Sequence, residues 1–158
     1  MNRSQFVYVT YIHTTQEKLW SALTDTDFMK QYWFGMHCES DWQPGSTWKL
    51  ISSEGKIYDD GEIVEANEPN RLVIRWHHQN KPELSHEGPS LCTMELETVG
   101  PAVKLSITHT IERSPSLLID AVSGGWPKIL SNLKSLLETG KVALYEPYPA
   151  QTNRTTAA

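Results

Sequence analysis

Residues 71–78 and 103–111 alternate between apolar and polar side chains, and each stretch carries one histidine on its apolar side. These are His78 in the first stretch and His109 in the second. Strict alternation is typical of a half-buried β-strand, so both imidazoles are expected to face the interior. An imidazole there can orient a ligand or transfer a proton near neutral pH, which makes both histidines candidates for catalysis. The alternative is a buried histidine that only hydrogen-bonds to a neighbour.

Cys92 lies on the apolar side of another alternating stretch, 91–99. It could act as a nucleophile only with a base beside it, and His109 is the histidine that could approach it from a neighbouring strand. Nothing in the sequence indicates a lowered thiol pKa, so a cysteine nucleophile is not expected. The second cysteine, Cys38, has no metal-ligand spacing to Cys92, and both are expected to be free thiols, with a disulfide as the alternative.

Asp59, Asp60 and Glu62 form an acidic cluster. Adjacent strand residues point to opposite faces, so the two aspartates are expected to separate. Asp60 or Glu62 would be a polar group of a pocket if it pointed inward, whereas a solvated strand edge is the simpler interpretation.

The same alternation separates His77 from His78, so these neighbours cannot easily share one metal ion. The sequence has no Gly-x-Ser-x-Gly elbow, no phosphate-binding glycine loop and no dinucleotide fingerprint. We therefore expect neither a metal site nor a cofactor.

The segments that must position these side chains are mostly strands. Strand patterns occupy 6–12, 47–52, 56–66, 71–78, 91–99 and 103–111, and turn signals separate most of them. Two short helices are expected between the first two strands, and 116–123 is expected to form another. Short turns between consecutive strands imply an antiparallel meander, one face of which must be covered.

The natural cover is a long amphipathic helix at 124–140. Pro127 suits its first turn, and Gly140 stands where a left-handed C-terminal cap is expected. The apolar face consists of Trp126, Ile129, Leu130, Leu133, Leu136 and Leu137. Residues 1–140 therefore read as one domain, followed by a partly disordered tail at 141–158.

Bulk properties exclude several classes of protein. The chain has 158 residues, a net charge of -5 and no run of Lys or Arg, which argues against nucleic-acid binding. It has no apolar run of membrane-spanning length and no signal-peptide core at its start. Free thiols without such a signal indicate the cytoplasm.

Several segments together resemble the START-like helix-grip superfamily, also called SRPBCC, and especially the homologues of the heat-shock-protein ATPase activator. Gly125-Trp126 with the leucine-rich helix after it is the most characteristic piece. Ser46 departs from the pattern, because a second glycine is common there. The other matching segments are 17–25, 32–35, 43–48, 61–65 and 69–72.

This resemblance implies an α+β fold in which a curved antiparallel sheet of six or seven strands grips the C-terminal helix. A cavity between sheet and helix would hold a hydrophobic or amphipathic small molecule. Trp33 and Phe34 would lie at one mouth of this cavity. The remaining expected ligand-binding residues are Trp48, Leu50, Tyr58, Ile74, Trp76, His78, Cys92, Met94, Ile107, His109, Trp126 and Leu130.

Three functions follow as hypotheses. The first is a non-enzymatic protein that binds an apolar small molecule. The second is a cyclase- or hydrolase-like enzyme on an aromatic or polyketide-like substrate, with histidine as its acid–base group. The third is a chaperone-partner domain, which would need an exposed apolar or charged patch. Homodimerisation through a strand edge or the aromatic loops is left open.

Overall fold

The computed structural model describes residues 2–147, in which alternating segments form one antiparallel sheet. The strands are β1 (Ser4–Ile12), β2 (His37–Ser40), β3 (Thr47–Ile51), β4 (Ile57–Asn67), β5 (Arg71–His78), β6 (Ser90–Val99) and β7 (Ala102–Ile111). The helices are α1 (Gln16–Thr24), α2 (Thr26–Tyr32), α3 (Pro82–Ser85) and α4 (Leu117–Thr139).

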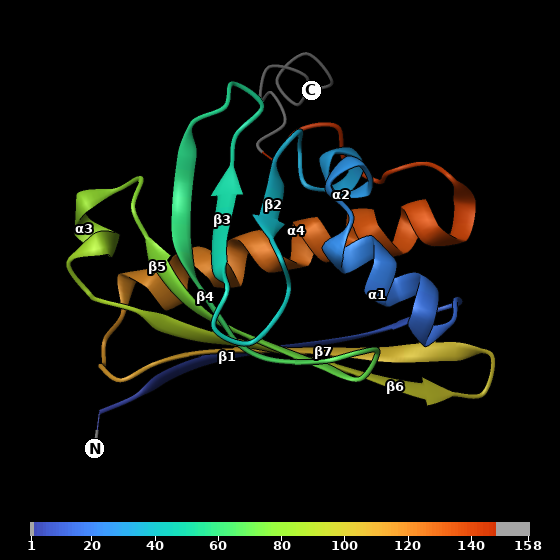
Figure 1. Ribbon diagram of the computed structural model, residues 1–158, viewed down its shortest axis with the longest axis horizontal. Helices are drawn as coiled ribbons and strands as arrows, with labels where there is room; N and C mark the ends of the chain where they lie inside the picture. The colour runs from blue at the N-terminus through green and yellow to red at the C-terminus, as the bar shows by residue number, and fades with distance from the viewer. Residues whose placement is uncertain (1, 148–158) are drawn as a thin grey trace, which may run out of the picture.

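The sheet runs in the order β1-β7-β6-β5-β4-β3-β2, so six strands form a meander and β1 pairs with the last of them. It is strongly curved, and α4 lies across its concave face with α1 and α2 beside it (Figure 1). The predicted α+β helix-grip architecture is therefore confirmed. Two short elements were not predicted from the sequence. They are the four-residue strand β2, and α3 inside the expected loop 79–90.

The start of the long helix was predicted wrongly. A single helix begins at Leu117 and continues through Gly124 and Gly125, so Pro127 lies inside it. Side chains cap its first turn: Ser116 accepts the N–H of Ile119, and Glu87 accepts two further backbone N–H groups. These bonds satisfy donors that a helix N-terminus otherwise leaves unpaired. The helix ends as predicted at Gly140, which has a left-handed φ of 82°.

The buried side chain of Asn132 on α4 hydrogen-bonds to the chain that follows the helix. Its Oδ1 accepts the backbone N–H groups of Ala143 and Leu144 at 2.9 and 2.7 Å. These two bonds connect residues 143 and 144 to the helix. The rest of the tail for which disorder was predicted, 148–158, lies outside the described residues.

Gly61 of β4 allows a close approach of two strands. A Cβ at this position would lie 1.9 Å from the carbonyl oxygen of Arg75 on β5. The two strands therefore approach closely at Gly61, and the register shift of this strand pair falls further on, between Ile63 and Glu65. Asp59 and His78 are register partners near this end of the same two strands.

Candidate functional site

The space beneath α4, where the sequence predicts a cavity, is occupied by four tryptophans. This tryptophan cluster consists of Trp33, Trp48, Trp76 and Trp126, with ring centroids 4.4 Å apart for Trp48 and Trp76 and 5.6 Å apart for Trp33 and Trp126. The void left beside it measures about 10 Å³, about the space of one water molecule. An enclosed organic ligand therefore does not fit in this conformation.

Most of the predicted ligand-binding residues are accordingly packing residues of the core. None of them is more than 5% exposed, and they make the close contacts of an ordinary protein interior. They are Trp48, Leu50, Ile74, Trp76, Cys92, Met94, Ile107, His109, Trp126 and Leu130.

Both ring nitrogens of His109 are hydrogen-bonded within this core. Its Nδ1 accepts the indole N–H of Trp126 at 3.1 Å, and because an indole nitrogen can only donate, this ring nitrogen carries no proton. Nε2 therefore carries the proton and donates it to Oγ of Ser90 at 2.8 Å. Ser90 in turn donates to the backbone oxygen of Trp76 at 3.2 Å.

Burial lowers the pKa of His109 to about 4, against a partial opposing effect of the Asp59 carboxylate. The side chain is thus a neutral structural group near pH 7. Cys92 lies opposite His109 on the neighbouring strand, as the sequence suggested. Burial raises the pKa of its thiol, which argues against a thiolate nucleophile. Both cysteines are free and buried.

A wide groove lies beside the tryptophan cluster, and Trp33 belongs to both. This mouth groove has a volume of about 550 Å³, within the range of small-molecule sites. It lies between the α2–β2 connection, the ends of β4 and β5, α3 and the middle of α4. Its lining residues are Trp33, Phe34, Met36, Ser52, Ser53, Glu54, Tyr58, His78, Asn80, Lys81, Leu84, Ala121, Gly125, Lys128, Ile129 and Pro147. Trp33, Phe34, Tyr58 and His78 are the predicted residues that the structure brings together here.

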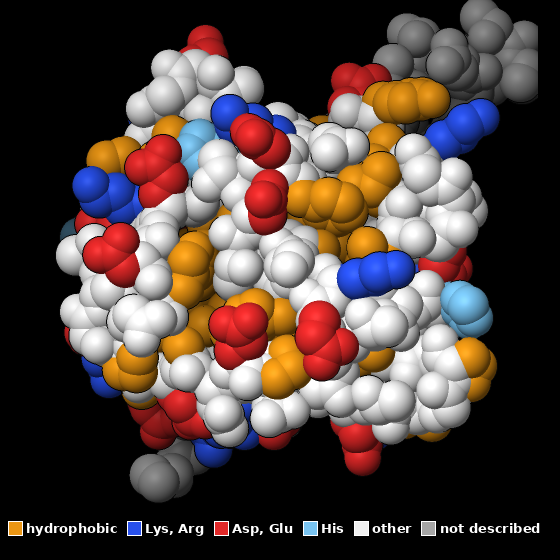
Figure 2. Space-filling view, turned by 45° about the vertical axis from the view of Figure 1, so that its right-hand side comes forward, with side chains coloured by type: hydrophobic (Ala, Val, Ile, Leu, Met, Phe, Trp, Pro, Cys, Tyr) orange, Lys and Arg blue, Asp and Glu red, His pale blue; other side chains and the backbone are white. Residues whose placement is uncertain are grey.

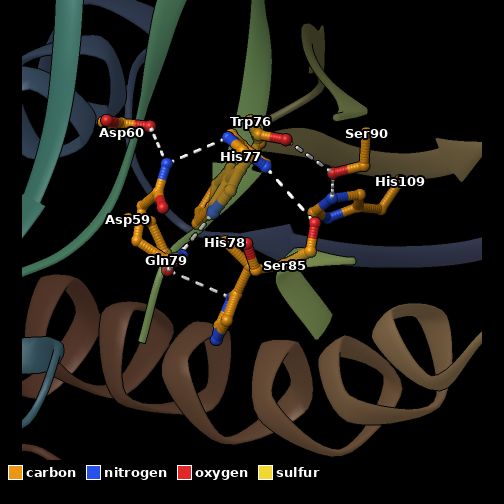
Figure 3. A network of polar contacts seen from close by, with 9 residues as sticks. All are labelled: Asp59, Asp60, Trp76, His77, His78, Gln79, Ser85, Ser90 and His109. Atoms are coloured by element: carbon orange, nitrogen blue, oxygen red, sulfur yellow. Dashed lines mark hydrogen bonds and ion pairs between the residues drawn. The ribbon is translucent and has the colours of Figure 1, made fainter. Parts of the chain in front are cut away.

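A buried carboxylate supports His78 at the groove. The Asp59 side chain is only 3% exposed, and its Oδ1 lies 3.1 Å from Nδ1 of His78, within ion-pair distance. Its Oδ2 accepts the indole N–H of Trp76 at 2.8 Å. The backbone N–H of Gln79 adds a longer bond of 3.4 Å to Oδ1. Figure 3 shows the imidazole of His78 extending from β5 toward α4, with Asp59 behind it.

The member of the acidic cluster that faces the interior is therefore not one of the two considered from the sequence. Asp59, not Asp60 or Glu62, points inward. Asp60 accepts the side-chain amide of Gln79 at 3.0 Å on the other side of the sheet, and Glu62 pairs with Arg75. The sequence pattern does indicate this direction. Side chains two apart on a strand share a face, so Asp59 lies on the same face as Ile63, which is a core position.

Phe34 is held in an uncommon backbone conformation at the rim of the groove. Its φ is 53°, in the left-handed region, and Gly35 follows at 83°. Such a conformation is costly for a bulky residue and persists only where the surroundings impose it. The turn places an aromatic ring beside the groove, where an apolar ligand would meet it.

The groove can thus offer an aromatic and aliphatic wall together with one imidazole backed by a carboxylate. Glu54, Lys81 and Lys128 are charged residues of the same lining. Among residues 2–147, no group of three or more His, Cys, Asp or Glu side chains gathers as metal ligands would. Within the same range no helix is long and apolar enough to cross a membrane.

The fold and this arrangement define a START-like helix-grip protein. The model of the family described as activator of Hsp90 ATPase homolog 1-like protein matches residues 13–138, and the chain belongs to that family. A search of curated protein sequences found no significant match.

Solved structures with the same fold come from proteins of different description. An Hsp90 activator from Plasmodium falciparum is 22% identical, with a TM-score of 0.69 over 85% of this chain and 96% of that one. The Aha1 dimer from Colwellia psychrerythraea is 24% identical, with a TM-score of 0.70 over 87% and 98%. DynU16, a protein of the dynemicin biosynthetic locus, is 21% identical, with a TM-score of 0.72 over 89% of this chain and 49% of that one.

Proposed function

We propose that this protein binds a small amphipathic molecule in the mouth groove. The observation that carries the proposal is the groove itself, about 550 Å³ of open space whose lining combines aromatic and aliphatic side chains with polar and charged ones and one imidazole. Ligand sites typically combine a mostly apolar wall with a few polar groups that fix orientation. The proposed site differs from the one expected from the sequence, between sheet and C-terminal helix, because that interior is filled.

The lining supports one kind of ligand. Trp33, Phe34 and Tyr58 favour a flat conjugated ring, and Ile129 adds an aliphatic surface from α4. His78, whose side chain is 19% exposed, can make a directed hydrogen bond to a hydroxyl or carbonyl at one end. The ligand would therefore be an aromatic compound with one polar group beside the ring.

Titration with 2-naphthol and with naphthalene tests this proposal. We expect 2-naphthol to bind more tightly, because only its hydroxyl can bond to the imidazole. Phe34→Ala should raise its Kd about fivefold to tenfold, since loss of a partly buried ring costs about 1 kcal/mol. Tyr11→Ala is the matched control, because it removes a ring that is 50% exposed on β1.

Calorimetry or ligand fluorescence gives the Kd values. Equal affinity of wild type and Phe34→Ala, or no binding of 2-naphthol at all, would contradict a ligand site in the groove. Native mass spectrometry of freshly purified protein gives independent support if an aromatic compound is retained.

Action on the Hsp90 ATPase is a second candidate function, favoured by the family to which the chain belongs. The face shown in Figure 2 presents apolar side chains in small areas separated by polar and acidic ones, not as one continuous patch. Any chaperone contact through this face would therefore be largely polar. Measuring the ATPase rate of Hsp90 with and without this protein decides the matter, and an unchanged rate at saturating concentration would rule out an activator role.

A further inference from the structure

We infer that the mouth groove is a proton-transfer site, in which His78 is the catalytic base and Asp59 its positioning residue. This inference rests on the proposed binding of an aromatic ligand in the groove. Its substrates would be conjugated compounds that carry a weakly acidic C–H or O–H group at the edge of the ring.

The geometry gives the two ring nitrogens of His78 different surroundings. Nδ1 faces the buried carboxylate at 3.1 Å. A carboxylate only accepts, so it favours the tautomer in which Nδ1 carries the proton. Nε2 then keeps its lone pair, and no partner for it occurs among residues 2–147. The imidazole lines the groove, so the free lone pair is available to a bound molecule.

The Asp59 side chain is itself held by a hydrogen bond from a buried residue. Trp76, which is 5% exposed, holds Oδ2 through its indole N–H at 2.8 Å. Gly61 lets β4 and β5 approach closely beside the pair. A base oriented by a fixed second group is the arrangement that proton-transferring sites share.

His109, by contrast, has both ring nitrogens bonded inside the core. His77 lies on the other side of β5 from His78, where its Nδ1 meets Gln79 at 2.9 Å. Of these three histidines, His78 alone combines a carboxylate partner with access to the groove.

The reaction needs no cofactor and no second substrate. Nε2 takes a proton from the bound compound as an N–H bond forms, and the electron pair of the broken bond moves into the conjugated system of the substrate. The imidazolium that results is stabilised by Asp59. It then returns the proton, either to another atom of the same molecule or to water, so that atoms and charge balance.

The probe for this chemistry is 5-nitrobenzisoxazole, a flat bicyclic compound that a single base can open. The base removes the ring C–H proton, its electron pair completes a nitrile, and the N–O bond breaks to leave a coloured phenolate. We expect turnover by wild-type protein, and His78→Gln should lower kcat/KM by about 10²-fold or more. His77→Gln is the matched control and should stay within about twofold of wild type.

Asp59→Asn tests the positioning role. The indole N–H of Trp76 can only donate, so the amide oxygen of Asn will face it and the amide NH2 will face His78. This reverses the favoured tautomer, placing the proton on Nε2 and removing the lone pair from the groove. We expect about 10²-fold lower kcat/KM, together with a change in the ¹⁵N shifts of the His78 ring that a merely structural role would not produce.

The wild-type protein gives a test that needs no variant. Turnover should be inhibited by 2-naphthol with a constant equal to its Kd. The inference is overturned if 2-naphthol binds but the probe turns over no faster than with the same concentration of free imidazole. It is also overturned if folded His78→Gln retains wild-type kcat/KM. Absence of 2-naphthol binding would instead refute the proposed function, and the inference with it.

Discussion

Trp48→Ala is expected to lower the free energy of unfolding by about 3–5 kcal/mol, the cost of truncating a large aromatic residue in a core. Trp48 is fully buried, and its ring lies 4.4 Å from that of Trp76. Among residues 2–147 its indole nitrogen has no oxygen or nitrogen partner, and it lies next to the sulfur of Cys38. Its contribution therefore comes from packing, and the space it leaves should be apolar.

Urea denaturation measures this loss, with Tyr11→Ala as the exposed control, for which a change below about 0.5 kcal/mol is expected. Added indole should partly restore the stability of Trp48→Ala by filling the new cavity. A loss below about 1 kcal/mol, with no effect of indole, would mean that the tryptophan cluster is loosely packed.

The second large effect is a dependence of stability on pH that His109 produces. Its pKa in the folded protein is about 4, below the ordinary value of 6.5. Between these values the unfolded state takes up a proton that the folded state does not. The stabilisation is therefore complete above pH 6.5 and is lost as the pH falls toward 4, by about 3 kcal/mol in total.

Denaturation of wild type and His109→Gln at pH 7 and at pH 4 isolates this effect. Carboxylates also contribute to acid sensitivity, so the relevant quantity is the difference in slope between the two proteins. We expect wild type to lose about 3 kcal/mol more than the variant over this range. His86→Gln, at an exposed position in the loop after α3, should retain the wild-type slope; equal slopes for wild type and His109→Gln would contradict the neutral, buried state of this histidine.

The sequence predicted the sheet well because alternation depends only on which face of a strand is covered. It predicted a helix over the right apolar face, but Pro127 led to a start that is too late. The capping by Glu87, which comes from a loop 29 positions before Ser116, is a tertiary contact that no local pattern contains. β2 has only four residues, too few for alternation to be recognised.

The candidate site was predicted only in part. Trp33, Phe34, Tyr58 and His78 do meet at the groove, since each lies at the end of its element near the open side of the grip. Side-chain volume, however, cannot be read from periodicity: the same inward pattern fits a hollow and a filled interior. The inward direction of Asp59 follows from alternation only if Ile63 is a core position, and an acidic cluster by itself does not show which of its carboxylates is buried.

The most direct test of the account is a map of where 2-naphthol binds. Titration of isotope-labelled protein, followed by backbone and methyl NMR, should shift signals of Phe34, His78 and Ile129 at the groove. Signals of Leu105 and Ile107, both fully buried, should stay unchanged. Large shifts of these two core residues, with none at the groove, would show that the ligand enters beneath α4 and would contradict a filled interior with its site at the mouth.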